Sequence, residues 1–299
     1  MQTKITSNCR PLLRAFYAFL IAIAALWAIA DNARAQLYIT NRPVEFSGPY
    51  VVSQYNAETG VVINANFITG VTQAEGLALQ DNILFVADLG AGTVGKYDAN
   101  TGGVINASFI MELNGPVGLA LLDNTLFVTN FYSGAVGAYD ATTGAAINAT
   151  LITNLSRPEG LAILPNVPLL PSALFVANSG AKFGTGSVGK YDATSGAPIK
   201  PDFIKRLNFP SGLLLVGNTL FVTSQTDGTV SEYSAITGEV IRHRFITGLS
   251  DPVELALKDN TLFVVNNSGT VGTYNATTGK PIHPTFITGL NFPVGIAVR

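Results

Sequence analysis

The sequence is poor in cysteine, histidine and charge, and each shortage excludes a class of protein. Its one cysteine, Cys9, precedes the main part of the chain, so no disulfide framework holds the fold together. Two histidines, His243 and His283, are too few for an imidazole-based zinc centre. Charged residues make up 12% of the chain, the net charge is −2, and no basic run appears, so nucleic acid is not an expected partner.

The first 35 residues differ from the rest and have the order of a secretory signal peptide. A basic start is followed by an apolar run over residues 15–30 and by Ala33-Arg34-Ala35, a small-x-small cleavage pattern. The alternative is a membrane anchor, but a run of about 16 residues falls short of the roughly 20 that span a bilayer. We therefore expect cleavage after Ala35, loss of Cys9, no stable membrane span, and a secreted or periplasmic protein.

What the chain does have is a repeat of about 42 residues, seen six times. A tyrosine followed by a short polar residue and alanine marks each copy, with spacings of 42, 42, 52, 42 and 41 residues between Tyr55, Tyr97, Tyr139, Tyr191, Tyr233 and Tyr274. A period near 42 with β-rich content is typical of a propeller or a solenoid. Such scaffolds carry many unrelated activities, so the repeat predicts architecture rather than function.

Each copy contains four short segments rich in β-branched and aromatic residues, which we interpret as strands. In one copy the first three segments are Gly118-Leu119-Ala120-Leu121, Leu126-Phe127-Val128 and Val136-Gly137-Ala138-Tyr139. The fourth segment is a Phe-Ile pair in most copies, such as Phe109-Ile110 in the preceding one. Pairs such as Asp123-Asn124 join the first two segments, and Thr143-Gly144 joins the last two. Both pairs favour the positive φ of tight hairpin turns. Each copy is therefore a four-stranded antiparallel meander.

The two ends of the repeat region are out of phase, and this predicts a closed ring. Residues 37–39 form a second strand with no first strand before it, and residues 295–298 form a first strand with no second strand after it. Pairing them completes a sixth blade, whereas an open solenoid would carry polar caps. We predict that residues 36–299 form an all-β, six-bladed β-propeller of four-stranded antiparallel blades, and that the protein is a monomer.

The segment from Leu126-Phe127-Val128-Thr129-Asn130 through Tyr139-Asp140-Ala141 to Arg157-Pro158-Glu159-Gly160 resembles the YVTN-type propeller repeat. It is also similar to the NHL repeat, whose first strand carries a Pro-x-Gly-Ile/Leu-Ala pattern. The resemblance covers nearly all of residues 36–299. It implies the propeller fold, and more distantly a likeness to gluconolactonase-like propellers, which place glutamate, asparagine and aspartate at the channel mouth.

In a propeller, first strands begin and second strands end on one face near the central channel, which brings two sets of polar residues there. Glu75 and Glu159 precede the repeated glycine, and Glu254 replaces that glycine in one copy. The second set follows the second strands and is almost wholly Asn or Asp. The candidate ligand-binding residues are Glu75, Asp88, Asn130, Glu159, Asn178, Glu254 and Asn266.

These residues allow two interpretations. Glu75, Asp88 and Glu159 would form an oxygen-rich site suited to Ca²⁺, with amide carbonyls completing it. Alternatively, the Asn/Asp set caps the loops that follow, which its presence in almost every copy favours. Glu254 needs a partner if it is buried, and Arg157 and Lys258 are the candidate cations.

Three functions remain open from the sequence. The first is a non-enzymatic scaffold that binds a protein, a glycan or a cell-surface component. The second is a calcium-dependent hydrolase of the lactonase type, and the third is a structural envelope protein. One copy carries longer loops at residues 165–171 and 180–186, which are either a recognition element or neutral insertions.

Overall fold

The computed structural model describes residues 35–42, 50–166 and 171–299, and all of the predicted signal peptide except Ala35 lies outside them. Residues Gln36–Arg299 form one compact unit. No helix among the described residues has the length and apolar character needed to cross a membrane.

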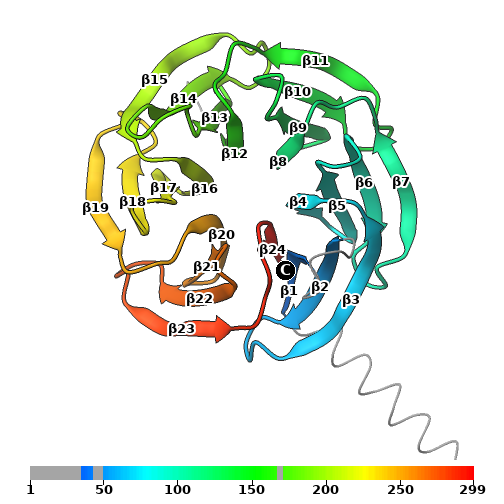
Figure 1. The fold of residues 1–299 in the computed structure, drawn as a ribbon. Coiled ribbons are helices and arrows are strands. Elements are labelled where there is room, and N and C mark those ends of the chain that lie inside the picture. Colours follow the sequence, from blue (N-terminus) through cyan, green and yellow to red (C-terminus); the bar gives the residue numbers. More distant parts are fainter. Residues whose placement is uncertain (1–34, 43–49, 167–170) are drawn as a thin grey trace, which may run out of the picture. The chain divides into compact units, whose positions relative to one another are not determined.

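The compact unit contains six four-stranded antiparallel sheets arranged in a ring, which confirms the predicted fold (Figure 1). We number these blades in chain order. Blade 1 contains β24 (Ile296–Val298), β1 (Gln36–Asn41), β2 (Tyr50–Asn56) and β3 (Val62–Val71). Blade 2 contains β4 (Ala74–Gln80), β5 (Ile83–Asp88), β6 (Thr93–Asp98) and β7 (Val104–Ile110). Blade 3 contains β8 (Pro116–Leu122), β9 (Thr125–Asn130), β10 (Ala135–Asp140) and β11 (Ala146–Ile152).

The remaining blades repeat this order, with the first strand of each nearest the centre and the fourth outermost (Figure 1). Blade 4 contains β12 (Pro158–Leu164), β13 (Ala173–Asn178), β14 (Gly186–Asp192) and β15 (Pro198–Leu207). Blade 5 contains β16 (Pro210–Val216), β17 (Thr219–Ser224), β18 (Thr229–Ser234) and β19 (Val240–Ile246). Blade 6 contains β20 (Pro252–Lys258), β21 (Thr261–Asn266), β22 (Thr270–Asn275) and β23 (Pro281–Ile287).

The two ends of the propeller close the ring within blade 1. Strand β24 pairs with β1 through Leu37 with Val298 and Ile39 with Ile296. Gln36 and Arg299 exchange both backbone hydrogen bonds, at 3.2 and 3.0 Å. The closure follows from the out-of-phase ends, since an unpaired β1 would leave a row of backbone groups without partners.

The hydrophobic core lies between neighbouring blades, because each second strand is apolar on both faces. In β5, Leu84 and Val86 pack in one cluster with Tyr38 of blade 1. The intervening Phe85 packs with Leu126 of blade 3. Alternation along a strand therefore sends successive side chains into two different interfaces.

The predicted turns and tyrosines also have the expected geometry. Asp123 and Gly144 both have positive φ, 51° and 77°, as do Asp81, Gly217 and Asp259 at the first turn and the equivalent glycine of every other blade at the second. The six repeat tyrosines are buried. At Gly137 a Cβ atom would lie 2.6 Å from the Tyr139 ring, so this glycine makes room for the tyrosine two residues later.

The fourth strands are longer than the sequence predicts. The Phe-Ile pairs are the buried ends of strands that begin five residues earlier with exposed side chains, as in β3 and β7. Each blade thus ends in an edge strand whose first half is exposed even at apolar residues such as Val104 and Ile105, so this half lacks the alternation of buried and exposed residues that marks a half-buried strand.

Candidate functional site

A β-bulge at the start of the innermost strand positions the carboxylates at the channel mouth. In blade 2, Ala74 pairs with Asp88 and Leu77 with Val86, so Glu75 and Gly76 together face the single residue between them on β5. Blade 4 has the same irregularity, which places Glu159 in the equivalent position. A bulge of this kind turns a side chain out of the regular alternation.

The glycine at the second position of each such bulge allows the blades to converge. A Cβ on Gly76 would lie 2.2 Å from the carbonyl oxygen of Val117, and one on Gly118 would lie 2.1 Å from that of Glu159. Blade 6 departs from this pattern, because Glu254 replaces the glycine. Its Oε1 would be 3.0 Å from a Cβ on Gly212, so its side chain occupies space beside the neighbouring blade.

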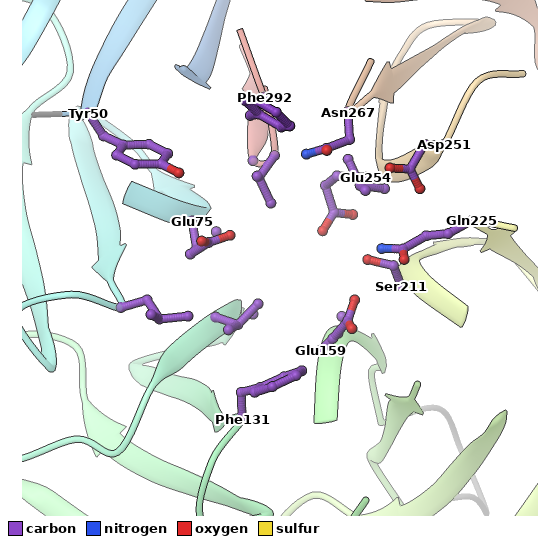
Figure 2. Close-up of a pocket in the computed structure, with 18 of the residues that line it drawn as sticks. Tyr50, Glu75, Phe131, Glu159, Ser211, Gln225, Asp251, Glu254, Asn267 and Phe292 are labelled. Carbon is purple, nitrogen blue, oxygen red and sulfur yellow. The ribbon is translucent and has the colours of Figure 1, made fainter. Parts of the chain in front are cut away.

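The three glutamates come from alternate blades, namely 2, 4 and 6, and point into one cavity of 390 Å³ (Figure 2). Asp251 adds a fourth carboxylate to the lining and Arg42 a cation. The walls also carry Tyr50, Phe131, Tyr132, Phe292, Ser211, Gln225 and Asn267. The cavity therefore combines carboxylates, amides and aromatic rings around the channel axis.

The intervening blades carry no glutamate at the mouth and have a threonine on the second strand. Thr129 in blade 3 accepts a hydrogen bond from Gly118 N at 2.7 Å and donates to Glu159 O at 2.8 Å. Thr40 and Thr223 accept the equivalent bond from Gly295 and Gly212 in blades 1 and 5. The three blades with this threonine have Val294, Val117 or Ser211 at the mouth. The three blades with a glutamate at the mouth have Ala87, Ala177 or Val265 in place of the threonine.

Burial and mutual repulsion raise the pKa values of the carboxyl groups at the mouth. Burial raises the pKa of Glu75 to about 7, a hydrogen bond from Gln73 opposes the rise, and the charge of Glu159 adds to it. Burial raises the pKa of Glu254 to about 8, with the Leu255 amide opposing and Glu159 again adding. The pKa of Glu159 is also raised, chiefly by burial. Glu159 thus interacts with both other glutamates.

Neither cation considered from the sequence pairs with Glu254. Within the described residues, the one hydrogen bond of its side chain is from its own neighbour Leu255 N, at 3.0 Å. Arg157 lies instead over the Phe131 ring, 5.9 Å from its centroid. The absence of a cationic partner is consistent with a neutral Glu254 side chain at physiological pH.

The Asn/Asp set lies one step outside the cavity and binds the protein's own backbone. The Asp88 carboxylate accepts hydrogen bonds from Thr72 N, Gln73 N and Ala91 N at 2.7, 2.8 and 3.1 Å. Asn130 Oδ1 accepts one from Asn114 N at 3.1 Å. Asp88, Asn130, Asn178 and Asn266 do not line the cavity. The loop-capping interpretation describes the hydrogen bonds of Asp88 and Asn130.

Asn178 and Asn266 share one feature that the other two lack. The Oδ1 atom of each is buried without a hydrogen-bond partner, although Asn266 Nδ2 donates to Thr270 at 3.1 Å. Neither side chain reaches the cavity. Their role as ligand-binding residues stays a prediction.

The proposed Ca²⁺ ligands do not form a cluster. Among the described residues, no group of three or more His, Cys, Asp and Glu side chains is placed to hold a metal ion. Glu75 and Glu159 face the cavity, but Asp88 is held by the loop amides. The residues present therefore do not fit the carboxylate set that the hydrolase hypothesis requires.

Sequence reasoning missed the residues that line the mouth next to the Asn/Asp set. The Asn/Asp set holds the last residue of each second strand. The residues that line the cavity come directly after it, namely Phe131, Gln225 and Asn267. The loop at residues 180–186 is on the same face but outside the lining, with Phe183 exposed. Part of the loop at 165–171 lies outside the described residues.

Comparison with known proteins supports the fold alone. No family model matches the sequence, and no curated protein matches it significantly. A chain in the crystal structure of a nidogen/laminin complex is similar with a TM-score of 0.70 and 16% identity, covering 88% of this chain and 98% of that one. The computationally designed Ika8 protein has a TM-score of 0.45 and 19% identity, covering 81% of this chain and 71% of that one.

Proposed function

We propose that this protein is an exported, non-enzymatic binding scaffold that captures a cationic side chain of a protein partner in the axial cavity. The observation that carries the proposal is the convergence of Glu75, Glu159 and Glu254 from alternate blades on one cavity. Export rests on the signal-peptide pattern of the first 35 residues. The YVTN or NHL affiliation and the secreted or periplasmic location are part of the same proposal.

Charge explains why a cation is the preferred ligand. The cavity holds four carboxyl groups and one guanidinium, and repulsion between the carboxylates contributes to the raised pKa values of Glu75 and Glu254. A cation in the centre would allow all three glutamates to ionise. Binding would therefore release protons and strengthen as the pH rises from 6 to 9.

The aromatic walls suit the same ligand. Tyr50, Phe131 and Phe292 lie around the mouth in Figure 2, and an arginine or lysine side chain would contact their rings along its alkyl stem. The similar chain in the nidogen/laminin structure belongs to a complex of proteins. That likeness makes a protein partner a reasonable choice for this fold, without identifying it.

The test uses Nα-acetyl-arginine methylamide and the methyl NMR signals of Val117, Val253 and Val294, which line the cavity. We expect saturable shifts that strengthen with pH and are lost when Glu75, Glu159 and Glu254 are all changed to Gln. The matched control changes the exposed Glu239 to Gln and keeps the response.

Two results would overturn the proposal. The first is no shift with the arginine derivative but saturable shifts with a neutral oligosaccharide, which would make the cavity a glycan site. The second is a rise in melting temperature with Ca²⁺ that chelation reverses and the triple variant abolishes, which would return the metal-dependent hydrolase.

A further inference from the structure

The protein already binds ammonium groups at two of its blade interfaces. In blade 2, the Lys96 ammonium lies 5.5 Å from the ring centroid of Phe85 and 4.6 Å from that of Phe109. It crosses to blade 3 and donates to Ala141 O at 3.0 Å and Thr142 O at 3.3 Å. Two ring faces and backbone carbonyls thus hold one cation.

Blade 4 repeats the arrangement. The Lys190 ammonium lies 5.3 and 5.2 Å from the ring centroids of Phe175 and Phe203, and donates to Ala235 O of blade 5 at 2.9 Å. The rings themselves are 5.4 Å apart, against 5.7 Å for Phe85 and Phe109. An ammonium group held by two rings and a backbone carbonyl therefore occurs twice, and in blade 4 the Lys200 ammonium also lies 5.4 Å from the Phe203 centroid.

Blade 6 keeps the ring pair but has no lysine. The centroids of Phe263 and Phe286 are 5.9 Å apart, and Phe263 pairs in register with Thr273. Phe85 and Phe175 pair in register with Lys96 and Lys190. Across the part of the chain that the structure describes, no Lys or Arg lies over the Phe263 and Phe286 rings.

The space that a lysine would fill is a cavity of 320 Å³ between blades 6 and 1. Its lining includes Ala57 and Glu58, the counterparts of Ala141 and Thr142, whose carbonyls receive Lys96. The backbone at this interface also matches that between blades 2 and 3. A Cβ on Gly60 would lie 2.6 Å from Phe286 O, as one on Gly144 would lie 2.3 Å from Phe109 O.

The charges around this cavity are mixed. Glu58 and Asp259 contribute carboxylates and Lys258 an ammonium group, and the His283 ring, which also lines the cavity, stacks on Phe286 with centroids 6.4 Å apart. Glu58 stands where the other five copies have Asn100, Thr142, Thr194, Ile236 and Thr277, so this interface alone gains a carboxylate at that turn.

We infer that this seam cavity, lined by Ala57, Glu58, Phe263, Thr273 and Phe286, binds the ammonium group of a primary alkylamine. The ammonium lies over the two rings and donates to the Ala57 carbonyl, as Lys96 does at Ala141. A free amine and a lysine side chain of another protein share this chemistry. The site is separate from the axial cavity.

The first experiment titrates n-butylammonium chloride while following the methyl NMR signal of Ile282, which lines the seam cavity. We expect a saturable shift with a dissociation constant in roughly the millimolar range, as befits a ligand of about five heavy atoms. n-Butanol, which has the alkyl chain without the charge, should give no comparable shift. Nα-acetyl-lysine methylamide reports whether a lysine side chain reaches the site as the free amine does.

The second experiment supplies the ammonium from within the chain. Thr273→Lys should abolish the Ile282 response to n-butylammonium and raise the melting temperature. The mirror variant, Lys96→Thr, should open an equivalent cavity in blade 2, and n-butylammonium should then raise its melting temperature more than that of the unchanged protein.

The inference is overturned if neither amine shifts Ile282, or if Thr273→Lys folds and leaves the response unchanged. If Thr273→Lys does not fold, the Lys96→Thr arm decides. In that arm, n-butylammonium must raise the melting temperature of Lys96→Thr more than n-butanol does. If it does not, rings and carbonyls alone do not select an ammonium group.

Discussion

Two sets of acidic and amide residues lie on the same face of this propeller, and they behave in opposite ways. Asp88 and Asn130 belong to the outer set, which recurs in nearly every blade, and both accept hydrogen bonds from loop amides. Glu75, Glu159 and Glu254 occur only in alternate blades, face a cavity, and have raised pKa values. In a repeat protein, a polar residue found in every copy serves the repeat, and one found in some copies is the better candidate for function.

The largest loss of stability should come from removing a side chain of the outer set. Asp88→Ala removes the acceptor of three backbone amides and should destabilise the fold by about 3 kcal/mol, because hydrogen bonds to a charged group are among the strongest in a protein. Urea unfolding measures this change. Asp88→Asn, which installs the residue found in blades 1, 3, 4 and 6, should cost much less.

Equal losses in these two variants would contradict the capping role. So would a normal urea midpoint for Asp88→Ala combined with loss of ligand response at the axial cavity. That second pattern would move Asp88 from the structural set to the functional one.

The second-largest expected effect is a gain in stability, from replacing a buried carboxyl group. A carboxyl group whose folded pKa exceeds its unfolded pKa binds more protons when folded, so stability falls as the pH rises between the two values. For Glu254 the window runs from about 4.5 to about 8. Glu254→Gln should therefore stabilise the protein at pH 9, by about 2 kcal/mol, and have little effect at pH 4.

Thermal unfolding between pH 4 and pH 9 checks this, with the exposed Glu239→Gln as the matched control. A Glu254→Gln variant that is less stable than the unchanged protein at pH 9 would mean that the ionised carboxylate has a partner in the folded state. Glu254 would then belong with the structural residues.

The smallest effect concerns the blades between the glutamates. Thr129→Val keeps the shape but removes the hydroxyl that bridges Gly118 N and Glu159 O, and should cost about 1 kcal/mol. Thr129→Ser retains the hydroxyl and should restore most of the loss in urea unfolding. If both variants unfold alike, the hydroxyl bridge contributes nothing to holding blades 3 and 4 together.

The sequence predicts the blades and the ring closure because both depend on periodic signals. Six tyrosines at regular spacing, the Asp-Asn and Thr-Gly turns, and the unmatched segments at 37–39 and 295–298 are all visible without the structure. The core follows for the same reason, since residues such as Phe85 alternate between two interfaces.

The site is only partly predictable, because one inserted residue changes which side chains face the channel. The bulge at Glu75 and Gly76 turns Glu75 into the mouth, while Asp88, which pairs with Ala74 just before the bulge, turns to the loop. Phe131 and Gln225, one position further on, take the places that we had assigned to the Asn/Asp set. The available signal is weak: these positions vary from blade to blade where their neighbours do not.

The seam cavity shows another limit. No single segment of sequence marks it, because Phe263, Phe286 and Ala57 meet only when the ring closes. It becomes visible when Thr273 is compared with Lys96 and Lys190 at the same register. The departure from the repeat, rather than a motif, is the informative feature.

The most direct test of the account is the ionisation of the mouth carboxyls themselves. We predict that ¹³C NMR titration of Glu75 and Glu254 will give apparent pKa values of about 7 and about 8, both lowered by Nα-acetyl-arginine methylamide. Titration of both groups near 4.5, with no response to the arginine derivative, would show that the glutamates do not share a buried site and would contradict the central claim.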